Sequence, residues 1–380
     1  MLRQATLALV VLPLISLAAH AELAVSAQDG KQVLVDGVPT VPDSPVADYV
    51  AIFDLGSNPP KLMAEVPAPT SVVGPPQSVA VAPDESFALV TSANAIDPAD
   101  PKKVTLNDKL TVIDLQSSPP QATATLTAGK GAAGVSINRA GKLALVANRS
   151  EGTVSVFTID GKTLTPAGKI ELGDDKSGPS HVVFSPDGKT ALVSRDGDSK
   201  ISVLSVDGGK VTYAKRDLSA GVRPYSIEMS ARGRGRRQRR DRERRCRYGE
   251  YHRSQSVARP RGRHTDGGAD AGRRAYFAGW EICRLHRGER VEQAQILAVL
   301  QRQRPREDLC HQRYQAHGGD RGKDRPLVPG RCLEQDRDQL MVQCMVEHEL
   351  QVFGFNGKTL TPRNPIKLKA GPAGIRTAEW

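Results

Sequence analysis

The sequence predicts an all-β protein built from repeats of four short antiparallel strands, and two observations support this. The first is a recurring pair of apolar strands joined by a tight turn, as in residues 78–90 and 181–193. The second is a strand that follows each pair and ends in Asp or Asn, as in residues 154–160 and 201–207. Alternation of apolar and polar residues with a period of two is typical of half-buried strands, and Asp-Gly is typical of hairpin turns.

The turns recur at a regular spacing. Pro83, Arg139 and Pro186 hold the same position in successive turns, at spacings of 56 and 47 residues, and Ala231 follows 45 residues later. Four short strands in about 45–56 residues is the length of one β-propeller blade. Strands of the second kind begin near residues 49, 110, 154, 201 and 350, and two more are expected in the segment discussed next. The sequence therefore predicts a seven-bladed β-propeller of four-stranded antiparallel blades.

Residues 232–339 interrupt this pattern. They hold 27 of the 35 arginines, one of the 18 lysines and four of the five cysteines. Shifted by one base, the codons for residues 277–282 permit the string S-P-D-G-K-Y, which resembles in-frame residues 185–189. We interpret this stretch as an apparent frameshift that corrupts two to three blades. The alternative is a real Arg-rich segment that is disordered or binds nucleic acid.

This interpretation divides the chain into four parts. Residues 1–21 are predicted to be a signal peptide, because an apolar run is followed by Ala-His-Ala, which fits a cleavage site. Residues 22–231 are expected to form blades 1–4 and the start of blade 5. Residues 232–339 are the out-of-frame segment, expected to be disordered, and residues 340–380 form the last blade and a strand that closes the ring. The expected location is periplasmic or secreted.

Charge and composition limit the partners. The chain has a net charge of +11, but residues 232–339 alone carry 28 basic and 15 acidic residues, so the remainder has a net charge of −2. We therefore expect no nucleic-acid partner. The chain has no further apolar stretch long enough to span a membrane, and Cys344 is the one cysteine outside the interrupted stretch. No cofactor motif and no metal site are expected, and the protein is expected to be a monomer.

Two motifs resemble a known family. Residues 185–189 with residues 191–193 resemble the repeat of the YVTN-repeat, lactonase-like seven-bladed propellers. Residues 178–186 resemble the Gly-Pro-Arg-His-x-x-Phe-x-Pro motif of the 6-phosphogluconolactonase branch of that superfamily. The resemblance implies a seven-bladed propeller and a lactone substrate. Ser180 stands where the motif has Arg, so the cationic clamp for a phosphorylated lactone is missing at this position.

Four residues are candidates for the site. His181 begins an inner strand and is the candidate catalytic residue, a general base acting on a lactone carbonyl at the channel mouth. The alternative is a strand histidine that is hydrogen-bonded to a neighbouring blade. Arg223 lies at the matching entry of the next blade, and Arg195 and Asn148 follow the second strands of their blades; all three are candidates for ligand binding. The alternative for these three is a rim charge or a structural loop residue.

Two functions are compatible with these observations. The main hypothesis is an exported β-propeller scaffold that binds an unidentified small molecule or protein at one propeller face, without catalysis. The alternative is a lactonase-type hydrolase that acts on a sugar or other lactone at the channel face. A cluster of polar side chains at one channel mouth would favour the enzyme, whereas a channel plugged by apolar side chains would favour the scaffold.

The frameshift interpretation makes a prediction about the gene. Nucleotide sequencing across codons 228–342 should reveal two compensating insertions or deletions, one near codon 231 and one near codon 339, because the reading frame is intact on both sides. Correcting them should restore alternating strand patterns throughout. A verified gene with no alternative open frame in this stretch would contradict the interpretation.

Overall fold

The computed structural model describes residues 22–35, 38–75, 77–229, 275–277, 280–282, 298–301, 338–355 and 359–378. In these residues the regular elements are β-strands, and no helix is present. The predicted all-β class is therefore confirmed. The expected signal peptide at residues 1–21, and most of the segment 232–339, lie outside the described residues.

The strands fall into two lists, one for each half of the chain. Before residue 220 they are β1 Leu23–Asp29, β2 Val33–Val35, β3 Val38–Thr40, β4 Tyr49–Asp54, β5 Lys61–Pro67, β6 Val79–Val81, β7 Phe87–Asp97, β8 Asp100–Asp114, β9 Gln121–Thr127, β10 Ala132–Ile137, β11 Leu143–Asn148, β12 Thr153–Asp160, β13 Thr163–Glu171, β14 Pro179–Phe184, β15 Thr190–Arg195, β16 Lys200–Asp207 and β17 Lys210–Ser219. After it they are β18 Ala275–Phe277, β19 Trp280–Ile282, β20 Ala298–Gln301, β21 Asp338–Cys344, β22 Glu349–Phe355, β23 Leu360–Pro362, β24 Ile366–Lys367 and β25 Gly371–Arg376.

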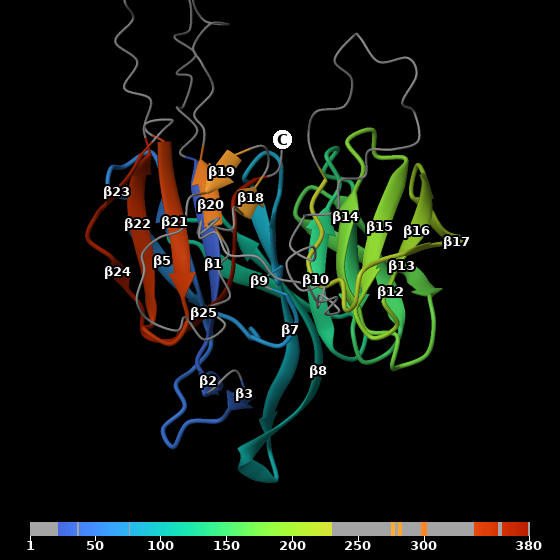
Figure 1. Ribbon diagram of the computed structural model, residues 1–380, viewed down its shortest axis with the longest axis horizontal. Helices are drawn as coiled ribbons and strands as arrows, with labels where there is room; N and C mark the ends of the chain where they lie inside the picture. The colour runs from blue at the N-terminus through green and yellow to red at the C-terminus, as the bar shows by residue number, and fades with distance from the viewer. Residues whose placement is uncertain are drawn as a thin grey trace, which may run out of the picture.

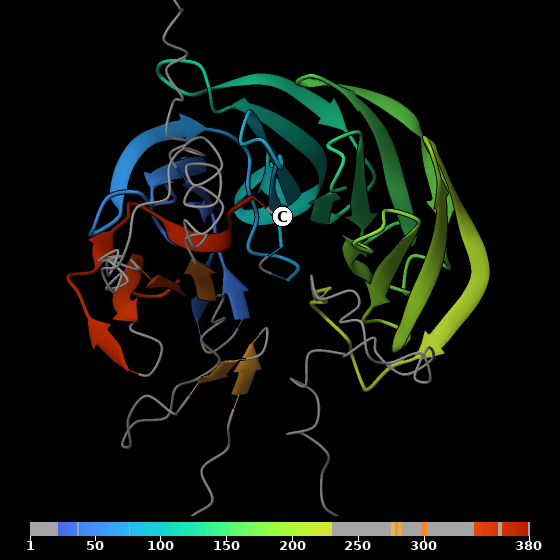
Figure 2. The same ribbon diagram turned by 90° about the horizontal axis from the view of Figure 1, so that it is seen from above.

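The larger sheets are propeller blades. Four-stranded antiparallel sheets run in the order β25-β1-β4-β5 in the first blade, β6 to β9 in the second, β10 to β13 in the third and β14 to β17 in the fourth. The last blade has the order β20-β21-β22-β23, with β24 also paired to β22. The described residues thus include five of the predicted blades, and the blades stand around a central axis (Figure 2). The predicted four-stranded antiparallel blade is confirmed.

The C-terminal strand closes the ring. β25 pairs with β1, from Val25 opposite Arg376 to Asp29 opposite Gly371, and becomes the innermost strand of the first blade. A parallel bridge between Val81 and Ala378 then joins this end of the chain to the second blade. The predicted pairing of the C-terminal motif with the N-terminal blade is confirmed. This pairing leaves no unpaired inner edge on β1.

The apolar core lies between adjacent blades. One cluster joins the second and third blades through Leu89, Leu110, Val135 and Val146, and similar clusters join the first to the second and the third to the fourth. The third strands, predicted to be half-buried, are buried on both faces in β4 and β12. In β4, for example, all five residues from Tyr49 to Phe53 are buried. The reason is that a blade packs against a neighbour on each side, so the side chains on both faces of these strands are removed from solvent.

Part of the Arg-rich segment contributes strands. β18 pairs with β19, and β20 pairs with β21 through Ala298 opposite Val342 and Gln301 opposite Gln339. The sheet that contains the expected last blade thus includes β20 from the Arg-rich segment beside β21, which begins at Asp338. The frameshift itself concerns the gene, and it stays a prediction.

Two hairpins project from the same end of the propeller (Figure 1). The β2–β3 hairpin is inserted between β1 and β4, and the long strands β7 and β8 continue past the blade to pair Asp97 with Asp100. Neither insertion was predicted. The 56-residue spacing from Pro83 to Arg139, against 47 for the next repeat, was the available signal for the second insertion.

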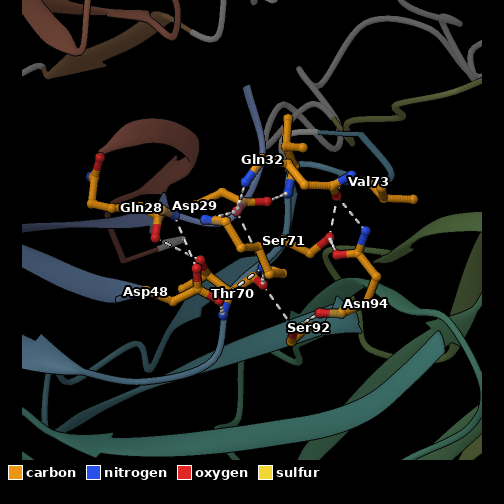
Figure 3. A network of polar contacts seen from close by, with 12 residues as sticks. Gln28, Asp29, Gln32, Asp48, Thr70, Ser71, Val73, Ser92 and Asn94 are labelled. Carbon is orange, nitrogen blue, oxygen red and sulfur yellow. Dashed lines mark hydrogen bonds and ion pairs between the residues drawn. The ribbon is translucent and has the colours of Figure 1, made fainter. Parts of the chain in front are cut away.

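A buried polar network anchors the base of the β2–β3 hairpin (Figure 3). The Lys31 ammonium is 2.8 Å from Asp48 Oδ2 and 3.2 Å from Asp29 Oδ1, and it also donates to the carbonyl of Thr70. Asp29 accepts backbone hydrogen bonds as well, including one of 2.7 Å from Val72. Burial raises the pKa of Asp29, and Lys31 opposes this rise. Because the buried charges are paired and hydrogen-bonded, the loops at this end are held in one arrangement.

Ring closure can be tested at Ile375, a fully buried residue of β25 that packs among residues of the first and last blades. Ile375→Ala should lower the free energy of unfolding by about 2–5 kcal/mol, because a cavity is left between two blades. Equilibrium urea unfolding measures this change. The control is Val346→Ala, at a position that is 67% exposed, where the change should stay within about 0.5 kcal/mol. Equal effects of the two substitutions would contradict a closed ring.

Candidate functional site

The site lies near the end of the channel that carries the two projecting hairpins. Antiparallel strands alternate in direction, so the turns between second and third strands all lie at one propeller end. The connections between one blade and the next lie at the same end. Arg149 and Asp196 belong to turns of the first kind, and Arg223 to a connection of the second kind. These turns therefore surround one mouth of the channel.

A group of polar side chains from different blades meets in the channel below this mouth, and we call it the channel cluster: Gln77, His181, Ser226, Glu228 and Arg376. Gln77 Nε2 donates to Ser226 Oγ at 2.7 Å and to Glu228 Oε1 at 3.2 Å. The Arg376 guanidinium forms an ion pair with the Glu228 carboxylate. The segment 224–229, the end of β25 and the start of β6 are thereby joined around the axis.

His181 lies on β14 at the edge of this cluster and is 3% exposed. Its Nδ1 is 2.9 Å from the carbonyl oxygen of Ile227, so the ring joins the fourth blade to the segment that follows it. Gly134 of β10 makes room for the ring, since a Cβ there would come within 2.8 Å of the imidazole. This is the contact with a neighbouring blade that the second interpretation of His181 expected.

Burial lowers the pKa of His181 to about 4, with Arg376 adding to this effect while Glu228 and the Ile227 carbonyl oppose it. At neutral pH the ring is therefore uncharged, and Nδ1 carries the proton that it donates to Ile227. His181 is also buried, and its Nδ1 is hydrogen-bonded to the Ile227 carbonyl, so it is better suited to hold the channel wall than to activate water.

Glu228 is the ionised group of the cluster. Burial by itself would raise the pKa of its carboxyl, but the Arg376 guanidinium and hydrogen bonds from Arg376 and Gln77 outweigh this, and the net shift is downward. Its side chain is nevertheless 53% exposed, whereas that of Arg376 is 15% exposed. A carboxylate that has these partners and is also open to solvent is positioned to contact a molecule in the channel.

A second group lies at the mouth itself, and we call it the mouth cluster: Arg149, Ser180, Asp196, Arg223 and Tyr225. Asp196 Oδ2 accepts from Arg149 at 2.7 Å and from Arg223 at 3.1 Å. Arg149 also donates to Ser180 Oγ, and its guanidinium carbon lies 5.4 Å from the centre of the Tyr225 ring. Because Ser180 and Tyr225 each precede a member of the channel cluster, the two groups are contiguous.

Asn148 and Arg195, expected to bind a ligand, are held within their own blades. Asn148 is fully buried, and its side chain bonds to Gly129, Thr153 and Ser155 at 2.8–3.0 Å. The Arg195 side chain is 4% exposed and pairs with Asp198 in the turn after β15 and with Asp217 on the edge strand β17. Of the four candidates, the structure brings His181 to the channel cluster and Arg223 to the mouth cluster.

The other members of the two clusters were not predicted, although the repeat carried a signal for four of them. Counting from the start of each inner-strand motif, Glu228 and Arg376 occupy the same repeat position, where the fourth blade has Val183. Opposite charges at a position that is otherwise small or apolar indicate side chains meeting across the axis. Arg149 and Asp196 likewise follow the second strand of successive blades.

Within the described part of the chain, no group of three or more His, Cys, Asp or Glu residues is arranged to hold a metal ion. The same residues contain no helix that is long and apolar enough to cross a membrane.

The comparisons with known proteins agree with this architecture. Residues 102–229, which contain His181, Glu228 and the complete mouth cluster, match the sequence model of the family "Lactonase, 7-bladed beta-propeller". Over these residues, about a third of the chain, the protein is similar to the lactonase-like β-propellers. A comparison of the propeller with the curated proteins finds no significant match.

Several solved structures are similar to this chain. The periplasmic gluconolactonase of Pseudomonas aeruginosa has a TM-score of 0.41 at 11% identity, over 95% of this chain and 86% of that chain. A protein from Lactobacillus plantarum has a TM-score of 0.39 at 13% identity, over 94% and 99%. Hydrazine synthase of Kuenenia stuttgartiensis has a TM-score of 0.35 at 24% identity over 51% of this chain, which spans 48% of that chain.

The buried, neutral His181 predicts a pH dependence of stability. Its pKa in the folded state, about 4, lies below the ordinary value of 6.5. Between these pH values the unfolded state binds more protons, so the free energy of unfolding should fall as pH drops from about 6.5 to about 4, by up to roughly 3 kcal/mol. Urea unfolding at pH 7.0 and 4.8 measures the fall. His181→Gln should remove most of it, while His348→Gln, at a turn between β21 and β22, should retain it. A fall of the same size in the His181 variant would contradict the assignment.

Proposed function

We propose that this propeller hydrolyses a lactone in its channel, with Glu228 and Arg376 at the reacting centre. The observation that carries the proposal is the channel cluster, because polar and charged groups from different blades meet there in place of an apolar plug. The family match over residues 102–229 supports a lactone as the substrate class. These two observations favour hydrolysis over a scaffold without catalysis.

The Glu228 carboxylate is the group that activates water. It takes one proton as the water oxygen attacks the lactone carbonyl carbon, and the resulting tetrahedral intermediate carries a negative charge on the former carbonyl oxygen. Collapse of the intermediate breaks the ring C–O bond. The proton held by Glu228 then passes to the leaving alkoxide oxygen, so a lactone and a water yield one hydroxy acid.

Arg376 supplies the positive charge that this intermediate needs. Its guanidinium already contacts Glu228, so it lies beside the position of the attacking water. Fixed donors directed at a developing oxyanion lower the barrier more than they stabilise the uncharged substrate. Because Arg376 and Glu228 carry opposite charges and His181 is neutral, the cluster as a whole is uncharged before substrate binds.

Gln77 orients the substrate. It is 1% exposed, and its Nε2 hydrogens are directed to Ser226 and Glu228. Its Oε1 is buried and has no hydrogen-bond partner in the described residues. A buried acceptor without a partner is costly, and a hydroxyl of a polyhydroxy lactone would satisfy it. We place this reaction in the periplasm or outside the cell, on the basis of the signal sequence expected at residues 1–21.

The reaction can be tested with glucono-δ-lactone as the probe, by following acid release in weakly buffered solution with the spontaneous rate subtracted. Glu228→Gln should lower kcat/KM by about 10²–10⁴, the range expected for loss of a general base. Arg376→Gln should lower kcat by about 10²-fold through loss of an oxyanion donor. The control is Glu171→Gln, an exposed glutamate of β13 remote from the channel, which should retain full activity.

The pH profile tests for a base with a low pKa, as expected of Glu228, against a histidine with the ordinary pKa. Because the pKa of Glu228 is shifted below 4.5, kcat/KM should stay constant as pH falls from 7 to about 5. Loss of activity with a midpoint near 6.5 would instead assign the base to a histidine. Absence of any hydrolysis above the spontaneous rate, with a panel of γ- and δ-lactones, would exclude the proposed reaction.

A further inference from the structure

We propose that the mouth cluster is a binding subsite for an anionic group, a phosphate or a carboxylate, with Arg149 and Arg223 as its ligands. The inference rests on the proposed function in one respect, because it assigns the group to a substituent of the molecule that enters the channel. The subsite itself is argued from the charges and contacts at the mouth.

The charges at the mouth do not balance. Two guanidinium groups share one carboxylate, since Asp196 Oδ2 accepts from both Arg149 and Arg223. Among the residues that the structure describes, no other acidic side chain forms an ion pair with either arginine. Asp196 is 2% exposed, so its single negative charge interacts with groups inside the protein. One of the two positive charges therefore remains unpaired at the solvent side of the mouth. An anion is the ligand that neutralises this excess.

The two arginines are held in place by contacts that an isolated rim charge would lack. Arg149 is fixed by Ser180 Oγ and Asp196, and it lies over the face of Tyr225, where cation–π attraction restricts its plane. Its side chain is 20% exposed, which leaves part of the guanidinium accessible. A planar guanidinium fixed in this way can bind an oxyanion through two parallel hydrogen bonds.

Arg223 donates to the same oxygen of Asp196 and has an unfavourable backbone conformation. Its φ is +53°, a value that a non-glycine residue adopts rarely, and the next residue is Pro224. Local strain of this kind persists where surrounding contacts enforce it and is concentrated at binding sites. Here it aims the side chain toward Asp196, and 71% of that side chain stays exposed, as a ligand group at a pocket rim requires.

Ser180 helps to hold the Arg149 guanidinium, which comes from the neighbouring third blade. The side chain at position 180 is a buried hydroxyl whose single O–H is within reach of the Gly178 carbonyl at 2.9 Å and of Asp196 Oδ1 at 3.2 Å, and it accepts a hydrogen bond from Arg149 of the third blade. The Arg149 guanidinium of the neighbouring blade therefore lies beside the uncharged Ser180 side chain. Since His181 and Ser226 directly follow Ser180 and Tyr225, the mouth cluster adjoins the channel cluster along the chain.

The test uses the full chain and measures binding without a lactone, so that it does not depend on turnover. Isothermal titration with inorganic phosphate and, separately, with D-glucuronate should show binding of at least one anion, and the stronger of the two identifies the preferred group. Arg223→Gln should weaken that binding about three- to tenfold, and Arg149→Gln about tenfold or more, because charge-assisted hydrogen bonds are lost. The control is Arg139→Gln, an exposed arginine of the turn between β10 and β11 at the other end of the third blade.

The outcomes separate this inference from the proposed function. Anion binding that depends on Arg149 and Arg223 supports the subsite even if no lactone is hydrolysed. Lactone hydrolysis without anion binding, or binding that Arg139→Gln weakens as much as the other two substitutions do, overturns the subsite and leaves the hydrolase intact. Arg149→Gln could disturb the contact between blades, so circular dichroism melting accompanies each variant. The exposed Arg223 position is decisive in either case, because an unchanged affinity in a folded Arg223→Gln variant overturns the proposal.

Discussion

The pairing of β25 with β1 is the constraint on which the site depends. Residues from the two ends of the chain form one antiparallel ladder, and this ladder makes the C-terminal strand the innermost strand of the first blade. The position of Arg376 in the channel is a direct consequence, because it lies in the last pair of that ladder, opposite Val25. The ion pair between Arg376 and Glu228 exists only when the ring is closed. Stability of the ring and assembly of the channel cluster are therefore one event.

The packing between blades has a second consequence for the site. Each blade packs its apolar faces against the neighbouring blades. The channel is therefore the region where the inner strands present polar groups toward the axis. A polar group in such a place is stabilised only if it finds a partner on another blade. Gln77, His181 and Arg376 each do so, with partners in the segment 224–228. The same contacts that satisfy these groups also fix the distances within the candidate active site.

Charge is distributed in two layers along the channel. The mouth cluster has an excess of one positive charge, whereas the channel cluster pairs Glu228 with Arg376 and keeps His181 neutral through burial. In the proposed function, a positive entrance above the uncharged channel cluster attracts the anionic group of the substrate while Glu228 stays ionised. The buried network of Lys31, Asp29 and Asp48 supports the same mouth from the side of the first blade.

The sequence by itself determined the repeat, and with it the four-stranded blades, their turns and the closing strand, because these follow from alternation and spacing along the chain. It also pointed to His181, since an inner-strand start is recognisable within one repeat. The partners of Glu228, Arg376 and Arg149 were decided by the tertiary structure alone. These residues lie on different blades, between 31 and 151 positions away from the groups they contact, and only closure of the ring brings them together. The same holds for protonation: a histidine in a strand motif has no predetermined charge, and the burial that lowers its pKa is a property of the packed blades.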